Sequence, residues 1–425
     1  MVCEIICVGT ELLLGDIINT DGAFIAREIA SLGFSSYHQT IVGDNHERLT
    51  EAVNTAFGRA DIVILTGGLG PTCDDITKKT VADALGKGMH LDEETLEDIK
   101  RFFEIRHKPM TDNNILQAMI PDGAVIFHNE WGTAPGIAMS GTVGGGTKHA
   151  ILLPGPPSEC EPMFYKCARP YLEKLTGSVI YSLNIHLSGI GESAAEDILR
   201  DIMEKSTNPT VAPYAGEHEV RIRVTARSES IEKSMAMCRE MYDVIAKTEV
   251  GRYIYFETDN PFDAKNATAT ALVRELKNHN MTFATAESCT AGMISSTVGD
   301  IPGASSVLLG GIVSYSNEVK MKLLGVPEDT LKNHGAVSVE CAGFMAEGAK
   351  KAVGADIAVS VTGIAGPGGG TPEKPVGTVC FGVSDEKGTY TEKVLFGNKN
   401  DRAKIRRLTT AHAMMLVIKR LRNII

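Results

Sequence analysis

The sequence lacks the features that mark several classes of protein. Its nine cysteines are odd in number and include no C-x-x-C pair, so we expect neither a disulfide framework nor a zinc site, and a cytoplasmic location fits best. Aromatic residues make up only 6% of the chain, with one Trp, which argues against a carbohydrate-binding or aromatic-cage protein. No apolar run reaches the roughly 18 residues that span a bilayer, and the N-terminus has no signal-peptide pattern. We therefore expect no membrane partner.

Basic residues are also fewer than acidic residues. The formal net charge is −11, so nothing global favours nucleic acid as a partner. An anionic small molecule remains compatible with this charge if backbone amides bind it locally. The 43 glycines follow no G-X-Y period, which indicates tight turns and not collagen. A length of 425 residues predicts two to three globular domains.

The hydrophobic pattern predicts an α/β chain of three units, at 1–170, 176–256 and 262–425. In the first, apolar runs alternate with amphipathic helices as β-α-β-α-β, which predicts a parallel sheet covered on both faces. The second has the order β-α-β-β-α-β, typical of a small ferredoxin-like α+β fold, beginning with a strand at Ser178. Glu257–Pro261 (ETDNP) is the expected linker to the third, another α/β unit that ends in a helix over Arg402–Leu421.

A glycine turn carries the first candidate site. The segment Thr66–Thr77 (TGGLGPTCDDIT) follows a strand and opens a helix, an arrangement whose backbone amides can bind phosphate. Asp74 and Asp75 beside it suggest a hard cation. The alternative is also open, because glycine turns follow many strands and Asp is a common helix cap. Further loops that contain Asp44 and Gly155 also follow predicted strands, and such loops converge at the carboxyl ends of a parallel sheet.

These segments resemble a known family. GTELLLGDIINTD, VGDNHERL, TGGLGPTCDDITKKT, GTAPG and LLPGPPSE are similar to the N-terminal domain of the CinA (competence/damage-inducible protein) family, which has a molybdopterin-binding-like, three-layer α/β fold. The resemblance implies hydrolysis of ADP-ribose-like dinucleotides with a divalent metal. It assigns metal and nucleotide chemistry to Asp44 and Asp75, which with Asp74 are the expected metal residues. Cys73 is a departure, since we expect a basic or polar residue there. The expected substrate-binding residues of this domain are Thr66, Gly67, Gly68, Gly70, Asp44 and Gly155.

A second candidate site lies in the third unit. Ser288 follows a predicted strand in Ala286–Gly292 (AESCTAG), a usual position for a nucleophile because the helix N-terminus stabilises developing negative charge. A serine nucleophile needs a base, and His334 or a neutral Lys320 are the candidates. The alternative makes Ser288 a helix cap and Lys320 a solvated residue. Cys289 is a rival nucleophile, but its apolar helix indicates a buried, inert thiol.

Two more segments surround this constellation. The glycine-rich loop Val361–Gly370 ends a strand and can supply backbone donors to an oxyanion or phosphate. In the basic terminal stretch, Arg402 and Arg406 lie one turn apart and can jointly hold a phosphate, although a solvated helix face explains the same pattern.

The motifs AESCTAG, GGIVSYSNEVKMKLLGV, HGAVS, VTGIAGPGGGTPEKPVGTV and GNKNDRAKIRR resemble the C-terminal domain of the CinA family, a nicotinamide-nucleotide amidase. The resemblance implies Ser288 as nucleophile, Lys320 as general base, and Tyr315 and Thr290 as assisting residues. It places Gly363, Gly366 and Arg402 or Arg406 near the substrate. The tail GNKNDR is two residues longer than the usual G-[DN]-R, so it leaves open which arginine contacts the phosphate.

The resemblance thus implies a hydrolase of pyridine-nucleotide salvage. One site would convert nicotinamide mononucleotide (NMN) to nicotinic acid mononucleotide without a cofactor, and the other would hydrolyse ADP-ribose with a divalent metal. The family resemblance also implies a homodimer. Two alternatives stay open: only one domain is catalytic, or the chain is a non-catalytic adaptor in DNA uptake or repair.

Overall fold

The computed structural model describes residues 1–176, 179–397 and 401–425. Ser178, the expected start of the middle strand, and Asn398–Asn400 of the tail motif lie outside the described residues. Contacts divide the chain into two compact units, Met1–Tyr181 with Thr225–Met237 and Ser182–Val224 with Cys238–Ile425. In the described part of the chain, no helix combines the length and the apolar character needed to cross a membrane.

The first unit is built on a six-stranded sheet of order β2-β1-β3-β8-β7-β6. Its first four strands pair in parallel, and β7 and β6 add to the edge antiparallel. The strands are β1 (Val2–Val8), β2 (Ser35–Val42), β3 (Ile62–Thr66), β6 (Val125–Phe127), β7 (Gly136–Val143) and β8 (Gly146–Leu153). The predicted parallel β-α-β-α-β arrangement is confirmed.

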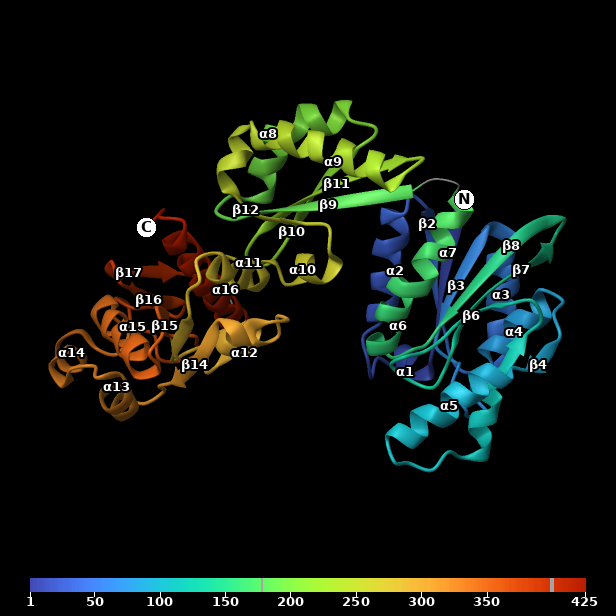
Figure 1. Ribbon diagram of the computed structural model, residues 1–425, viewed down its shortest axis with the longest axis horizontal. Helices are drawn as coiled ribbons and strands as arrows, with labels where there is room; N and C mark the ends of the chain where they lie inside the picture. Colours follow the sequence, from blue (N-terminus) through green and yellow to red (C-terminus); the bar gives the residue numbers. More distant parts are fainter. Residues whose placement is uncertain (177–178, 398–400) are drawn as a thin grey trace. The chain divides into compact units, whose positions relative to one another are not determined.

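Helices cover both faces of this sheet (Figure 1). Side chains alternate along β1, so Ile5 packs into the core on one face and Ile6 into the core on the other. The first face is covered by α2 (Thr20–Ser31), α6 (Pro157–Met163) and α7 (Arg169–Thr176), and the second by α3 (His46–Arg59) and α4 (Thr77–Ala84). This is the three-layer α/β fold that the sequence predicts.

One part of the first unit is absent from the predicted elements. Between α4 and β6 the chain forms α5 (Glu93–Ile105) and a two-stranded sheet of β4 (Met89–Leu91) and β5 (Met119–Pro121). Leu96, Ile99 and Ala118 form a small core of their own beneath α5.

The middle segment has the predicted order β-α-β-β-α-β and a sheet of order β10-β11-β9-β12. Val220, Ile222 and Val224 of β11 are buried, whereas Arg221 and Arg223 are partly exposed, as the alternation predicts. The elements are β9 (Val179–Leu187), α8 (Glu192–Lys205), β10 (Thr210–Ala215), β11 (Val220–Ser228), α9 (Ile231–Ala246) and β12 (Ile254–Thr258).

The expected linker Glu257–Pro261 is shorter than predicted, because only Asp259 and Asn260 lie between elements. Glu257 and Thr258 belong to β12, and Pro261 already opens α10 (Pro261–Lys265). Asn260 caps that helix by accepting hydrogen bonds from the backbone N–H groups of its second and third residues. Tyr255 and Phe256 of β12 pack into the core of the C-terminal sheet. The polar residues that suggested a linker therefore form the end of a strand and the cap of a helix.

The C-terminal sheet has the order β14-β13-β15-β16-β17, with β14, β13 and β15 parallel and the other pairs antiparallel. Its strands are β13 (Phe283–Glu287), β14 (Leu308–Val313), β15 (Ile357–Gly363), β16 (Thr378–Asp385) and β17 (Gly388–Leu395). One face is covered by α11 (Ala267–Asn278), α12 (Met293–Gly299) and α16 (Arg402–Leu421), and the other by α13 (Asn317–Leu324) and α15 (Val339–Val353). The predicted α/β class is confirmed.

Gly67, directly after β3, lies against the carboxyl end of the neighbouring strand β1, and this close contact can be tested. Its φ is 88°, and a Cβ on it would lie 2.2 Å from the carbonyl oxygen of Val8. We expect Gly67→Ala to lower the free energy of unfolding of the first unit by about 2 kcal/mol or more. Trp131, the chain's one tryptophan, packs against this unit's core, so its fluorescence during urea unfolding measures the effect.

Gly144→Ala is the matched control. Gly144 also has a positive φ, of 59°, but a Cβ there meets nothing within 4 Å. The Gly144→Ala variant should lose only about 1 kcal/mol of unfolding free energy, the cost of placing an alanine at a positive φ. Equal losses in the two variants would contradict the proposed close approach to Val8.

Candidate active sites

Loops at the carboxyl edge of the first sheet enclose a cavity of about 640 Å³. They follow β1, β2, β3 and β8, whose parallel carboxyl ends lie at one edge. All the residues that the sequence placed in this site line the cavity, namely Asp44, Thr66, Gly67, Gly68, Gly70, Asp74, Asp75 and Gly155.

The glycine loop after β3 is held tightly. The N–H of Gly67 donates to the carbonyl of Leu153 over 3.1 Å, and the N–H of Thr77 donates to the carbonyl of Gly68 over 3.2 Å. A Cβ on Gly68 would lie 2.1 Å from Thr77 Oγ1, and one on Gly70 would lie 2.5 Å from Asp75 Oδ2. The loop therefore brings backbone close to the cavity where a side chain would obstruct it.

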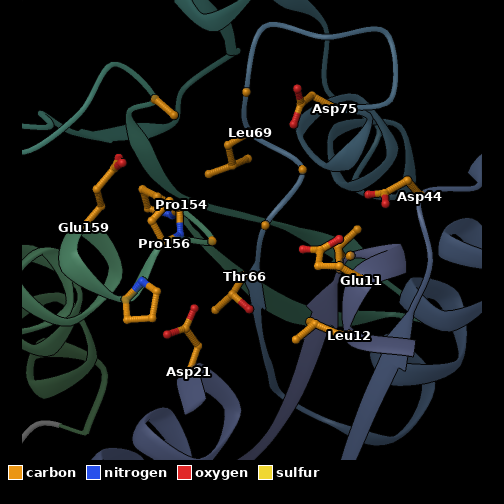
Figure 2. Close-up of a pocket in the computed structure, with 18 of the residues that line it drawn as sticks. Glu11, Leu12, Asp21, Asp44, Thr66, Leu69, Asp75, Pro154, Pro156 and Glu159 are labelled. Atoms are coloured by element: carbon orange, nitrogen blue, oxygen red, sulfur yellow. The ribbon is translucent and has the colours of Figure 1, made fainter. Parts of the chain in front are cut away.

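Asp44 and Asp75 each have one carboxylate oxygen fixed by the protein. Asp44 Oδ2 accepts from Thr10 N and Oγ1 over 2.9 and 2.8 Å. Asp75 Oδ2 accepts from Thr72 N and Oγ1 over 2.8 and 2.7 Å, so Asp75 closes a turn and does not cap α4. Figure 2 shows the two carboxylates on the same side of the cavity as Glu11. Asp74 is exposed at the rim.

The charge of the cavity is entirely negative among the described residues. Its lining contains no Lys, Arg or His and six carboxylates, those of Glu11, Asp21, Asp44, Asp74, Asp75 and Glu159. A phosphate would therefore need a cation in addition to backbone amides. Carboxylate oxygens are the ligands that Mg²⁺ prefers, usually one or two together with waters and substrate phosphates.

Asp44 and Asp75 fit that donor set. No group of three or more His, Cys, Asp or Glu within residues 1–176, 179–397 and 401–425 is arranged to hold a metal ion by itself. A cation here would therefore depend on the ligand for part of its coordination.

Asp21 is a residue of this cavity that the sequence did not single out. It is the second residue of α2, it is only 7% exposed, and its Oδ1 has no hydrogen-bond partner among the described residues. Burial, and then the nearby charge of Glu161, raise the pKa of its carboxyl to about 6. Its position at a helix start is typical of a capping acid, which is why the sequence gave no signal.

The C-terminal sheet carries the second site, again at the carboxyl ends of parallel strands. Ser288 directly follows β13, and Lys320 projects from α13 after β14. Lys320 Nζ lies 3.0 Å from Ser288 Oγ and is 1% exposed. The solvated role for Lys320 is therefore wrong.

The surroundings of Lys320 favour its neutral form. Nζ donates to the carbonyls of Ser314 and Tyr315 over 2.6 and 3.3 Å, so its three polar partners are uncharged. Burial lowers the pKa of Lys320 below its usual value. A neutral amine has two N–H donors and one lone pair. With both donors used by carbonyls, the lone pair is left for the Ser288 hydroxyl.

The turn after Ser288 is strained and firmly anchored. Ala291 has a φ of 52°, in the left-handed region that side chains rarely adopt. Glu287, fully buried, accepts from Thr285 Oγ1, Ile294 N and both donors of Ser295. The N–H groups of Cys289 and Thr290 donate to no backbone carbonyl in the described chain, so they are candidates for binding an oxyanion. Cys289 is buried, and burial raises its pKa to about 12, as expected of an inert thiol.

The structure separates the two terminal arginines. Arg402 donates to the carbonyl of Gly366 and to the Tyr315 hydroxyl, each over 2.8 Å, and lines a cavity of about 680 Å³ with the loop after β15. Arg406 donates to the carbonyl of Thr290 over 2.7 Å, so it supports the nucleophile turn. Thr290 Oγ1 and Arg406 Nε are both buried without a partner in the described chain. Gly363 ends β15 beneath this loop.

His334, the alternative base, is placed elsewhere. It ends α14 (Glu328–His334), is about half exposed, and lies 3.4 Å from Glu340. The polar partner of Ser288 Oγ is Lys320.

Comparisons with known proteins cover the whole chain. Three family models match in succession, described as a probable molybdopterin binding domain (residues 4–174), the damage-inducible protein CinA KH domain (182–255) and the CinA C-terminal domain (265–421). A CinA-like protein of Dictyoglomus turgidum is 45% identical over 425 residues, 100% of both chains. The chain belongs to the CinA family.

Two further similar proteins are named as competence/damage-inducible proteins. A putative competence-damage inducible protein of Caldicellulosiruptor bescii is 45% identical over 99% of both chains. A crystal structure of the competence/damage inducible protein CihA from Agrobacterium tumefaciens is 38% identical, covering 37% of this chain and 94% of that chain, with a TM-score of 0.36. The molybdopterin-binding model spans all loops of the first cavity, and the CinA C-terminal model spans Ser288 and Lys320.

The unpartnered carboxylate of Asp21 generates a stability prediction for this CinA chain. A carboxyl whose pKa is raised on folding contributes stability below about pH 4 and loses it as the pH rises through about 6. We expect Asp21→Asn to raise the free energy of unfolding by roughly 1–3 kcal/mol at pH 7.5, with the gain vanishing near pH 4. Trp131 fluorescence in urea measures it. A loss of stability at pH 7.5 would show that the charged form has a protein partner.

Proposed function

We propose that the chain hydrolyses the carboxamide of nicotinamide mononucleotide at Ser288. The supporting observation is the buried pair of Ser288 and Lys320, 3.0 Å apart, with two carbonyls occupying the amine's donors. A buried amine of lowered pKa is a suitable general base for a serine at neutral pH.

In the proposed reaction, Lys320 Nζ takes the hydroxyl proton as Ser288 Oγ bonds to the carboxamide carbon. The N–H groups of Cys289 and Thr290 stabilise the oxyanion. The C–N bond breaks, and ammonia leaves with the proton that Lys320 returns. Water then attacks the acyl-enzyme, Lys320 accepts its proton, and nicotinic acid mononucleotide is released as Ser288 regains its own.

Arg402 is the residue that we assign to the substrate phosphate. It lines a cavity beside the loop after β15, and the Gly366 carbonyl and the hydroxyl of Tyr315 already orient its guanidinium. Arg406 and Thr290 are positioning residues in this scheme, because they act on the turn that carries Ser288.

The first cavity supports a second activity, hydrolysis of ADP-ribose to AMP and ribose 5-phosphate. A divalent metal held by Asp44 and Asp75 would neutralise the pyrophosphate and polarise it for attack by water. The amides of Gly68 and Gly70 would bind phosphate oxygens, while Gly67, whose N–H is used by Leu153, and Gly155 beside it keep the loop close to the cavity. The excess of carboxylates over basic side chains is the observation that favours a metal-dependent reaction.

Ser288→Ala and Lys320→Met should each lower the rate of ammonia release from NMN about a thousandfold or more, because nucleophile and base act as a unit. Lys322→Met is the control, since Lys322 is exposed on the same helix and should behave as wild type. In wild type, kcat/KM should rise with pH along a limb whose midpoint lies below 10.5, the ordinary lysine value. Full activity of Lys320→Met would refute the proposed base.

Asp75→Asn should lower ADP-ribose turnover about a hundredfold, and EDTA should remove it in wild type. Asp83→Asn is the control, because Asp83 is exposed on α4 and is paired with Lys79. Ammonia release from NMN should be unchanged in both variants. Turnover of ADP-ribose that survives EDTA would rule out the metal assignment.

A further inference from the structure

The carboxylate of Asp21 faces the first cavity without a partner from the protein. The residue is more than nine-tenths buried, yet its Oδ1 accepts no hydrogen bond from any described residue. Figure 2 shows its carboxyl projecting from α2 beside Thr66, on the opposite side of the cavity from Asp44 and Asp75. A buried polar atom of this kind is costly to leave unpaired.

The cavity offers no donor that would explain this atom as part of an ion pair. Its lining has no cationic side chain among the described residues. The charged group that shifts the pKa of Asp21 is Glu161, another acid. A hydroxyl or an N–H group of a bound molecule would supply the missing donor.

We propose that Asp21 accepts a hydrogen bond from a ribose hydroxyl of a nucleotide bound in this cavity. The inference rests on the proposed nucleotide chemistry of the site. The glycine loop, Asp44 and Asp75 occupy the phosphate side, and a sugar attached to that phosphate would extend toward the opposite wall. Acidic side chains commonly bind ribose hydroxyls in nucleotide sites of α/β sheets.

The size and polarity of the site agree with this assignment. A volume of about 640 Å³ lies within the range of small-molecule sites, and the lining that contains Asp21 also contains apolar residues such as Leu12 and Ile17. In such a setting a single buried acceptor gives strong selectivity, because an analogue that lacks the hydroxyl leaves the carboxylate unpaired. Asp21 is thus a specificity residue for ribose over deoxyribose.

The test is calorimetric binding of AMP, 2′-deoxy-AMP and 3′-deoxy-AMP to the full chain with Mg²⁺. Wild type should bind AMP about tenfold or more tightly than at least one of the deoxy nucleotides. Asp21→Ala should reduce that ratio to about one, and Asp21→Asn, which keeps the side-chain volume and one acceptor oxygen but removes the charge, should reduce it part of the way.

Asp75→Asn is the matched control, because it removes a carboxylate on the phosphate side of the same cavity. It should weaken AMP and the deoxy nucleotides by the same factor, which also assigns the measured binding to this cavity. A selectivity ratio that is unchanged in both Asp21 variants would overturn the inference, as would the absence of AMP binding by wild type.

The outcome is separable from that of the proposed hydrolysis. Suppose that the wild-type chain does not hydrolyse ADP-ribose, yet it prefers AMP over a deoxy nucleotide and the Asp21 variants lose that preference. The binding role of Asp21 then stands and the pyrophosphatase proposal fails. If ADP-ribose is hydrolysed while selectivity is independent of Asp21, the reverse holds.

Discussion

Parallel strand pairing is the constraint on which both candidate sites depend. Neighbouring parallel strands end at the same edge, so the loops after β1, β2, β3 and β8 meet around one cavity, and the loops after β13, β14 and β15 meet around Ser288. Helices on both faces bury these sheets and fix the strand ends. Residues that are 32 positions apart in sequence, such as Ser288 and Lys320, are brought into contact in this way.

The two candidate sites, one at each sheet edge, differ in the charged side chains that they contain. The first concentrates carboxylates around a glycine loop, so a phosphate there depends on amides and a cation. The second buries a lysine among carbonyls, where its charged form is disfavoured, and supplies Arg402 at the margin. Overall acidity therefore says little about anionic ligands, because each site sets its own local potential.

Much of this was predictable from the sequence because the strands are continuous apolar runs and the motifs follow them. α16 has the predicted bounds, and the buried Ser288–Lys320 pair joins two residues singled out by their motifs. The region of α5 was not predicted, since its small core rests on only a few apolar positions. Glu257 and Thr258 have the composition of a linker although they complete a strand. Asp21 could not be found, because an acid at a helix start looks the same whether or not its carboxylate is buried.

The packing of β12 bears on how freely the domains of this family can be separated. Tyr255 and Phe256 fill the core of the C-terminal sheet, and Arg422 of the terminal segment donates to the carbonyl of Tyr255 over 2.7 Å. Arg407 of α16 also pairs with Glu217, which precedes β11. A C-terminal unit cut off after β12 would need other residues to cover the core surface that Tyr255 and Phe256 bury here. In this chain the middle segment therefore contributes to the hydrophobic core of the C-terminal sheet.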